Sequence, residues 1–212
     1  MRHAQFTFAL VLLFSALAYG EQRGTPPSGA PPGGQPPPGG RGGGARRGAQ
    51  VITLETKAWP DGGQIPAKYT QAGEQVSPPL TWSNVPDGVA SFVLLAHDLD
   101  GATGNGTDDI LQWLLWNIPA AARSLPEGVP QGSQLPDGTR QISVSGPYYR
   151  GPGAPAAGPA HHYAFELFAL DATMDVQAVG ASPAQTRAAI VAAMAGHVRG
   201  KAVYVGLFKR RD

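Results

Sequence analysis

Two short segments of the chain carry side chains that can bind ligands or move protons. The first, residues 97–100 (HDLD), places Asp98 and Asp100 directly after a strongly apolar run. The second, residues 161–163 (HHY), follows a loop rich in Gly and Pro at residues 151–160. Imidazole and phenol groups donate hydrogen bonds to oxygens, and a carboxylate can orient an imidazole. A stiff loop with such donors beside a carboxylate is typical of a site for a small anionic group.

Short apolar runs separated by turns indicate that β-strands position these two segments. The predicted strands are Val51–Glu55, Ala90–His97, Leu111–Ile118, Ile142–Val144, Tyr163–Leu170 and Val203–Phe208. One helix is predicted over Ala184–Val198, because Ser182 is a favourable N-cap and Pro183 suits the first helical position. The pattern predicts a mainly β fold, an antiparallel β-sandwich with a large central sheet and a C-terminal helix.

The first fifty residues do not have the composition of a folded core. Met1–Gly20 has a basic start, an apolar run and small residues before Glu21, which predicts a secretory signal peptide. A retained membrane anchor is the alternative, although the apolar run is short for a bilayer span. Glu21–Gln50 contains 10 Gly and 7 Pro among its 30 residues, so we expect a disordered linker. The folded domain is predicted at residues 51–212 of a secreted or periplasmic protein.

The charge of the predicted domain argues against nucleic acid as a partner. The whole chain has a formal charge of +1, but residues 51–212 contain 11 Lys and Arg against 14 Asp and Glu, a formal charge of −3. A nucleic-acid-binding domain needs a basic surface, which this composition does not provide. The chain contains no Cys, so disulfides and thiolate chemistry are excluded. The sequence indicates no cofactor.

Four motifs occur in order along the predicted domain. They are SPPLTW with VPDG at 77–88, HDLDGA at 97–102, QW and NIP at 112–119, and GP with HHYAFELFALD at 151–171. Together with the closing GLFKR at 206–210, they resemble the phosphatidylethanolamine-binding protein family in its bacterial Raf-kinase-inhibitor-like branch. The resemblance covers residues 51–210. It implies a β-sandwich with a small preformed pocket that accepts phosphate or a phospholipid headgroup.

The resemblance also implies which residues line the pocket. The implied ligand-binding residues are Asp98, Asp100, Gln112, Gly151, Pro152, Pro155, His161 and Tyr163. Because a carboxylate repels an anion, we expect Asp98 to orient a donor or to meet an ammonium group, with capping of turn amides as the alternative. Glycine lets backbone N–H groups approach a ligand, and proline stiffens the loop. His162 should face the other side of its strand, so we interpret it as a surface residue.

Some positions depart from the family pattern. Gln112 stands where the family usually has a second pocket histidine, and glutamine donates a hydrogen bond without carrying charge. We therefore expect weaker and less pH-dependent anion binding. Ala154 replaces a proline that the family has in the loop at residues 151–160. The polar segment Gly101–Asp109 is predicted to be a flexible loop.

These observations favour non-catalytic binding of a small anion, with regulation of an unidentified protein partner as a further role. A homodimer is left open. The alternative is a metal-binding or hydrolytic enzyme that uses the region of Asp98 and His161. The carboxylates near His97 match no EF-hand loop, and the chain has no HExxH pair. A hydrolase would need an activated nucleophile, but there is no GxSxG elbow, and Ser143 and Ser145 have no evident base.

Overall fold

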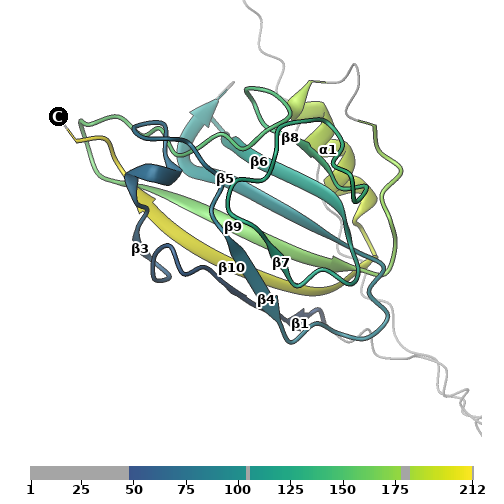
Figure 1. The fold of residues 1–212 in the computed structure, drawn as a ribbon. Helices are drawn as coiled ribbons and strands as arrows, with labels where there is room; N and C mark the ends of the chain where they lie inside the picture. Colours follow the sequence, from purple (N-terminus) through teal and green to yellow (C-terminus); the bar gives the residue numbers. More distant parts are fainter. Residues whose placement is uncertain (1–47, 104–105, 178–181, 212) are drawn as a thin grey trace, which may run out of the picture. The chain divides into compact units, whose positions relative to one another are not determined.

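The described part of the chain, residues 48–103, 106–177 and 182–211 of this computed structural model, forms two β-sheets, one α-helix and one short 3-10 helix (Figure 1). The predicted signal peptide, and the predicted linker up to residue 47, lie outside the described residues. The strands are β1 Gln50–Val51, β2 Thr53–Glu55, β3 Gly63–Gln64, β4 Leu80–Ser83, β5 Ser91–Thr103, β6 Asp108–Pro119, β7 Ser124–Leu125, β8 Arg140–Ile142, β9 His161–Leu170 and β10 Val198–Phe208. The helices are η1 Ala67–Tyr69 and α1 Pro183–Ala193.

The large sheet has the strand order β1-β10-β9-β5-β6-β8, and the small sheet has the order β2-β4-β7. The four long strands β5, β6, β9 and β10 pair antiparallel, whereas the short strands β1 and β3 pair in parallel with β10. The large sheet is therefore mixed. The mainly β fold predicted from the sequence, with a large sheet and a C-terminal helix, is confirmed.

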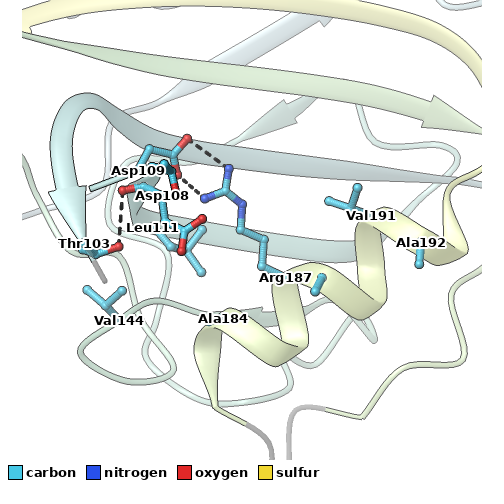
Figure 2. Close-up of a pocket in the computed structure, with 11 residues that line it drawn as sticks. Thr103, Asp108, Asp109, Leu111, Val144, Ala184, Arg187, Val191 and Ala192 are labelled. Atoms are coloured by element: carbon cyan, nitrogen blue, oxygen red, sulfur yellow. Dashed lines mark hydrogen bonds and ion pairs between the residues drawn. The ribbon is translucent and has the colours of Figure 1, made fainter. Parts of the chain in front are cut away.

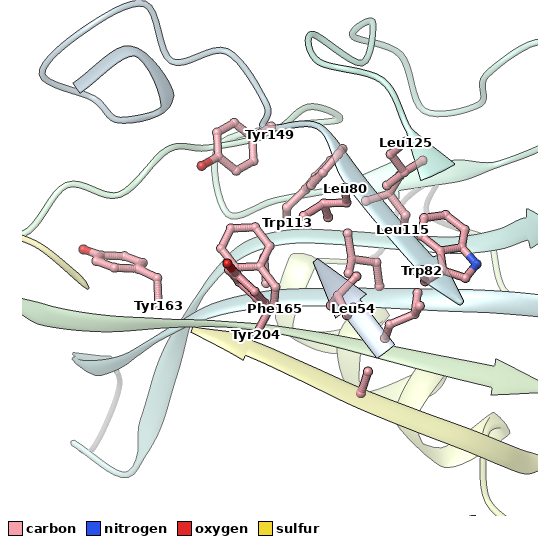
Figure 3. Close-up of a cluster of buried hydrophobic side chains, with 14 of the residues drawn as sticks. Leu54, Leu80, Trp82, Trp113, Leu115, Leu125, Tyr149, Tyr163, Phe165 and Tyr204 are labelled. Atoms are coloured by element: carbon pink, nitrogen blue, oxygen red, sulfur yellow. The ribbon is translucent and has the colours of Figure 1, made fainter. Parts of the chain in front are cut away.

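The core consists of two layers, one on each face of the large sheet. Between the sheets, Trp82 of the small sheet packs against Phe92 of the large sheet, with ring centroids 5.4 Å apart. The same buried cluster includes Trp113 and Leu115 of the large sheet (Figure 3). On the other face, Ile190 of α1 packs over a second cluster that includes Val93. Because both faces of the sheet are covered, the middle of β5 is apolar on both sides, which explains its continuous apolar run.

The helix is shorter than predicted. The Ser182 side chain accepts from Gln185 N while the Gln185 side chain accepts from Ser182 N, a complete capping box. The helix ends at Ala193, and Val198, predicted as its last residue, instead begins β10. Gly196 lies between them with φ +84°, a conformation that a helix cannot continue. Among the described residues, no helix combines the length and apolar character needed to cross a bilayer.

The polar segment Gly101–Asp109 is not simply the loop that the sequence predicted. Strand β5 continues through Thr103, and β6 begins at Asp108, where the two residues pair across the hairpin. The Thr103 hydroxyl donates to the Asp108 carbonyl at 3.3 Å. Polar residues can form strands here because both belong to a hairpin whose partner strand supplies the backbone hydrogen bonds.

Candidate functional site

Asp98 and His161 lie side by side on neighbouring strands of the large sheet. Asp98 is near the exposed end of β5 and pairs in register with Tyr163, while His161 is the first residue of β9. The His161 Nδ1 atom lies 3.0 Å from Asp98 Oδ2 and 3.1 Å from Oδ1. The side chain of Asp98 is 4% exposed and that of His161 is 19% exposed, so solvent reaches the pair through the imidazole.

The Asp98 carboxylate also holds the turn that follows it. Its Oδ1 atom accepts from the backbone N–H of Asp100 at 3.1 Å and of Gly101 at 2.9 Å. A Cβ atom at Gly101 would lie 3.1 Å from the Asp98 carboxyl carbon, so glycine permits this close approach. The carboxylate therefore caps turn amides and contacts the imidazole at the same time, and the two interpretations made from the sequence are compatible.

The contact with Asp98 determines what His161 can offer a ligand. A carboxylate acceptor places a proton on Nδ1, which leaves Nε2 as the second ring nitrogen. In the imidazolium form, Nε2 is also a donor and the ring carries a positive charge. Asp98 thus orients the imidazole.

Tyr163 provides the next donor group. Its side chain is buried, and its hydroxyl oxygen accepts from the backbone N–H of Gly153 at 3.2 Å and of Ala154 at 3.1 Å. Burial raises the pKa of Tyr163, and the neighbouring Asp98 carboxylate raises it further. The hydroxyl therefore stays protonated, and the two amides that donate to its oxygen make it a stronger donor.

The loop at residues 151–160 precedes β9, and we call it the rim loop. It is fixed at its start and exposed farther along. Gly151 and Pro152 are buried, whereas Pro155 is exposed. Gln71 Nε2 donates to the Gly151 carbonyl at 2.7 Å, and Gln71 N donates to the Pro152 carbonyl at 2.9 Å. A Cβ atom at Gly151 would lie 2.7 Å from the Tyr69 carbonyl oxygen, so only glycine fits there without movement. The sequence did not single out Gln71, which carries no motif of its own.

Gln112 clamps this loop from the opposite side. Ala96 pairs with Trp113 while His97 pairs with Leu111, so Gln112 is the extra residue of a β-bulge in β6. With its amide nitrogen turned toward the loop, Gln112 donates to the carbonyl oxygens of Arg150 at 2.9 Å and Gly151 at 3.2 Å. Gln112 is 3% exposed, and its amide protons are directed at the loop.

Asp100 lies outside the Asp98–His161 pair. Its carboxylate accepts from the backbone N–H of His162 at 2.6 Å and lies 2.8 Å from His162 Nδ1. The backbone and side-chain hydrogen bonds from His162 lower the pKa of Asp100. Both side chains are about half exposed, at 45% for Asp100 and 55% for His162. These two residues form a surface ion pair next to the site.

A second polar cluster lies on the other face of the sheet and was not recognised from the sequence. His97 Nδ1 lies 2.5 Å from Asp109 Oδ2, and Arg187 of α1 binds the same carboxylate (Figure 2). His97 Nε2 lies 3.3 Å from Glu166 Oε2 without the alignment of a hydrogen bond, and Lys201 Nζ lies 2.6 Å from Glu166 Oε1. None of these partners of His97 was recognised from the sequence, because they are far apart along the chain.

The charges of this cluster shift one another. Burial disfavours the charged form of His97, but Glu166 and Asp109 outweigh burial, so the pKa of His97 is raised. His97 is also the main cause that lowers the pKa of Glu166 to about 2, with Lys201 adding to the effect against burial. Among the described residues, no three His, Cys, Asp or Glu side chains are arranged to hold a metal ion.

Fold and site together define a mainly β domain with an Asp–His–Tyr cluster at one end of its large sheet. The profile of the family described as phosphatidylethanolamine-binding protein matches residues 55–209. The chain is 38% identical over 161 residues to a UPF0098 protein of Methanothermobacter thermautotrophicus. The aligned region covers 75% of this chain and 99% of that protein. The chain belongs to the phosphatidylethanolamine-binding protein family.

Other comparisons agree with this assignment. A protein named as the lipoprotein LppC in Mycobacterium tuberculosis is 32% identical over 153 residues, which cover 71% of each chain. The structure of CT736 from Chlamydia trachomatis, titled as a homologue of this family, matches with a TM-score of 0.61 and 27% identity over 76% of this chain and 99% of that one. Escherichia coli YbcL has the same fold, with a TM-score of 0.64 and 23% identity over 76% of this chain and 99% of that one.

Proposed function

We propose that the domain binds a small anionic group, a phosphate or the headgroup of a phospholipid, at Asp98, His161 and Tyr163, without catalysing a reaction. The observation that carries this proposal is the contact of His161 Nδ1 with the Asp98 carboxylate at 3.0 Å, which leaves the second ring nitrogen for a ligand. The rim loop and Asp100 form the surroundings of this site. The sequence resemblance also implies Asp100, Gln112, Gly151, Pro152 and Pro155, and we assign these residues to the surroundings of the three contact residues.

The site can bind an anion through donors of two kinds. In its imidazolium form, His161 can donate a charge-assisted hydrogen bond from Nε2, which is about twice as strong as a neutral one. The Tyr163 hydroxyl offers a neutral donor, because its raised pKa keeps it protonated. Asp98 contacts the imidazole and the turn amides, and its role is to orient His161. The negative charge of Asp98 would attract an ammonium group of the ligand, such as that of ethanolamine.

Binding is favoured over catalysis by the state of the hydroxyl groups. Tyr163 is buried with a raised pKa, so its phenolate nucleophile is disfavoured. Ser143 donates to the Gly146 carbonyl at 3.0 Å and accepts from Ser145 N at 3.2 Å, which are the bonds of a turn. Neither observation supplies the nucleophile–base pair that a hydrolase needs.

The proposal extends to an exported protein that acts on a partner by occupying an interface. Export is supported by the sequence pattern of residues 1–20 and by the name of the LppC relative. The Gly- and Pro-rich segment 21–47 has the composition of a spacer that separates the domain from a surface.

Titration of the full chain with inorganic phosphate and with phosphorylethanolamine tests the proposal. We expect chemical-shift changes at His161 and Tyr163, and an affinity at least tenfold lower in His161→Gln. His162→Gln is the matched control, because it removes an exposed imidazole one residue away, and it should change the affinity by less than threefold. Equal binding by both variants would contradict the proposal. Turnover of phosphate or carboxylate esters that is lost in His161→Ala would favour the enzyme instead.

A further inference from the structure

We infer that the end of the domain around the Asp98–His161 site is a docking surface for an anionic lipid bilayer. The surface consists of the basic tail Lys209–Arg211 and the exposed loop 155–159, and we call it the docking rim. This inference rests on the proposed function, because it names a bilayer as the source of the anion.

The basic tail lies directly beside the site. Strand β10 ends at Phe208, which pairs in register with His161, so the tail leaves the sheet next to the site histidine. Arg210 N donates to the Ala154 carbonyl at 3.2 Å, and Lys209 Nζ donates to the Gly158 carbonyl at 3.3 Å. Figure 1 shows the end of the chain and the loop before β9 at the same end of the sheet. The tail and the loop therefore form one continuous surface.

The tail concentrates positive charge on an acidic domain. Residues 51–212 have a formal charge of −3, yet Lys209, Arg210 and Arg211 follow one another in the sequence. All three are exposed, and among the described residues none of them forms an ion pair with a carboxylate. Asp212, which follows, lies outside the described residues. The nearby carboxylate of Asp100 is paired with His162.

A hollow beside the tail places apolar residues next to the cations. Lys209 and Arg211 line a cavity of about 490 Å³ together with Ile65, Pro66 and Phe208. Basic side chains that extend from an apolar surface can reach phosphate groups while their methylene stems stay covered. This arrangement is suited to the interface between lipid headgroups and acyl chains.

The exposed loop next to the tail is uncharged. Residues 154–160 read APAAGPA, and Pro155, Ala157 and Pro159 in this loop are exposed. At a bilayer, small apolar residues can enter the headgroup region while neighbouring cations contact lipid phosphates. A soluble polyanion would contact the cations alone, and the uncharged loop would contribute nothing. The pairing of an uncharged loop with a basic tail therefore favours the bilayer.

Vesicle flotation of the full chain tests this inference. We expect binding to vesicles of phosphatidylglycerol and phosphatidylcholine, and much weaker binding to phosphatidylcholine alone. The double variant Lys209→Gln/Arg211→Gln should bind the anionic vesicles about 10- to 30-fold more weakly, because each cation near an anionic surface adds roughly a fivefold factor. The matched control is Arg123→Gln/Arg199→Gln, which removes two exposed cations near the opposite end of the sheet, beside Phe92 and Asp171. This control should keep wild-type vesicle binding.

The outcomes separate this inference from the proposed function. The Lys209/Arg211 variant should bind soluble phosphorylethanolamine within threefold of the wild type, since it leaves Asp98 and His161 in place. Equal loss of vesicle binding in both double variants would overturn the docking rim while leaving the anion site intact. Tight binding to soluble polyphosphate without binding to vesicles would also overturn it, in favour of a soluble polyanion. Circular dichroism melting curves show whether each variant is folded.

Discussion

Asp98 Oδ2 and His161 Nδ1 lie 3.0 Å apart, although 63 residues separate them in the sequence. The contact forms because β5 and β9 are antiparallel neighbours, so the end of one strand meets the start of the other. The same carboxylate accepts two turn amides, which hold it in place before any ligand arrives. This preorganisation means that little ordering would be needed for the proposed anion to bind.

Removing the charge of Asp98 should weaken anion binding more than it weakens the fold. In Asp98→Asn, the side-chain oxygen can still accept from the turn amides, but the imidazole of His161 loses its anionic partner. A hydrogen bond to a charged group contributes roughly 1.5–3 kcal/mol, so we expect phosphate affinity to fall at least tenfold by calorimetric titration. Asp100→Asn, in the neighbouring surface pair, should change it by less than threefold. Equal losses in the two variants would argue against the orienting role of Asp98.

The amide of Gln112 should be required to hold the rim loop. Gln112→Glu has nearly the same shape but turns an oxygen toward the carbonyls of Arg150 and Gly151. The Gly151 carbonyl keeps its bond from Gln71, but the Arg150 carbonyl loses the donor from Gln112. An unsatisfied buried group costs roughly 1–3 kcal/mol, so urea denaturation should show a loss of about this size. Amide exchange at Gly153 and Ala154 should become faster. Unchanged stability and exchange would show that the clamp is not formed.

The tight contact at Gly151 gives a steric prediction. An alanine there would place Cβ 2.7 Å from the Tyr69 carbonyl oxygen and 2.9 Å from Thr70 Cα, both of which are backbone atoms. Overpacking of this kind costs roughly 1–3 kcal/mol, so Gly151→Ala should lower the free energy of unfolding by that amount and weaken phosphate binding. Gly48→Ala is the control, since nothing lies within 4 Å of its Cβ position. If both variants melt like the wild type, the loop is looser than the structure shows.

The cluster around His97 should make stability depend on pH on both sides of neutrality. The pKa of His97 is raised above its ordinary value of 6.5, so its contribution to stability is complete below pH 6.5 and is lost as the pH rises through the folded pKa. The pKa of Glu166 is lowered from 4.5 to about 2, so its contribution is present above pH 4.5 and is lost as the pH falls toward 2. Urea denaturation at a series of pH values should therefore show a maximum in the free energy of unfolding between pH 4.5 and the folded pKa of His97.

Two variants separate the limbs of this curve. His97→Gln should flatten the alkaline limb and also reduce the acid limb, because His97 is the main cause of the Glu166 shift. Lys201→Met should reduce the acid limb alone, since Lys201 contacts Glu166 and is absent from the causes acting on His97. If the loss of stability at alkaline pH persists in His97→Gln, another group is responsible for that loss.

Much of the fold follows from the sequence because strand and helix signals are local. The continuous apolar run at Phe92–Ala96 predicts a strand covered on both faces, and the Ser182-Pro183 start predicts the helix, which the capping box forms. The family motifs likewise resemble known patterns at fixed spacing, so the fold class could be predicted correctly. The helix end was predicted poorly, because the residues after Ala193 suit either state locally and pairing with β9 places Val198 in a strand.

The sequence by itself determined the mainly β class and named the residues that we propose to bind an anion, since both rest on local patterns. Only the tertiary structure decided how those residues are used. The bulge at Gln112 turns its amide toward the rim loop, and strand register brings Asp98 to His161. Likewise, the packing of α1 brings Arg187 to Asp109, 78 residues away. Such contacts depend on register and packing between distant segments, which no local pattern in a single sequence contains.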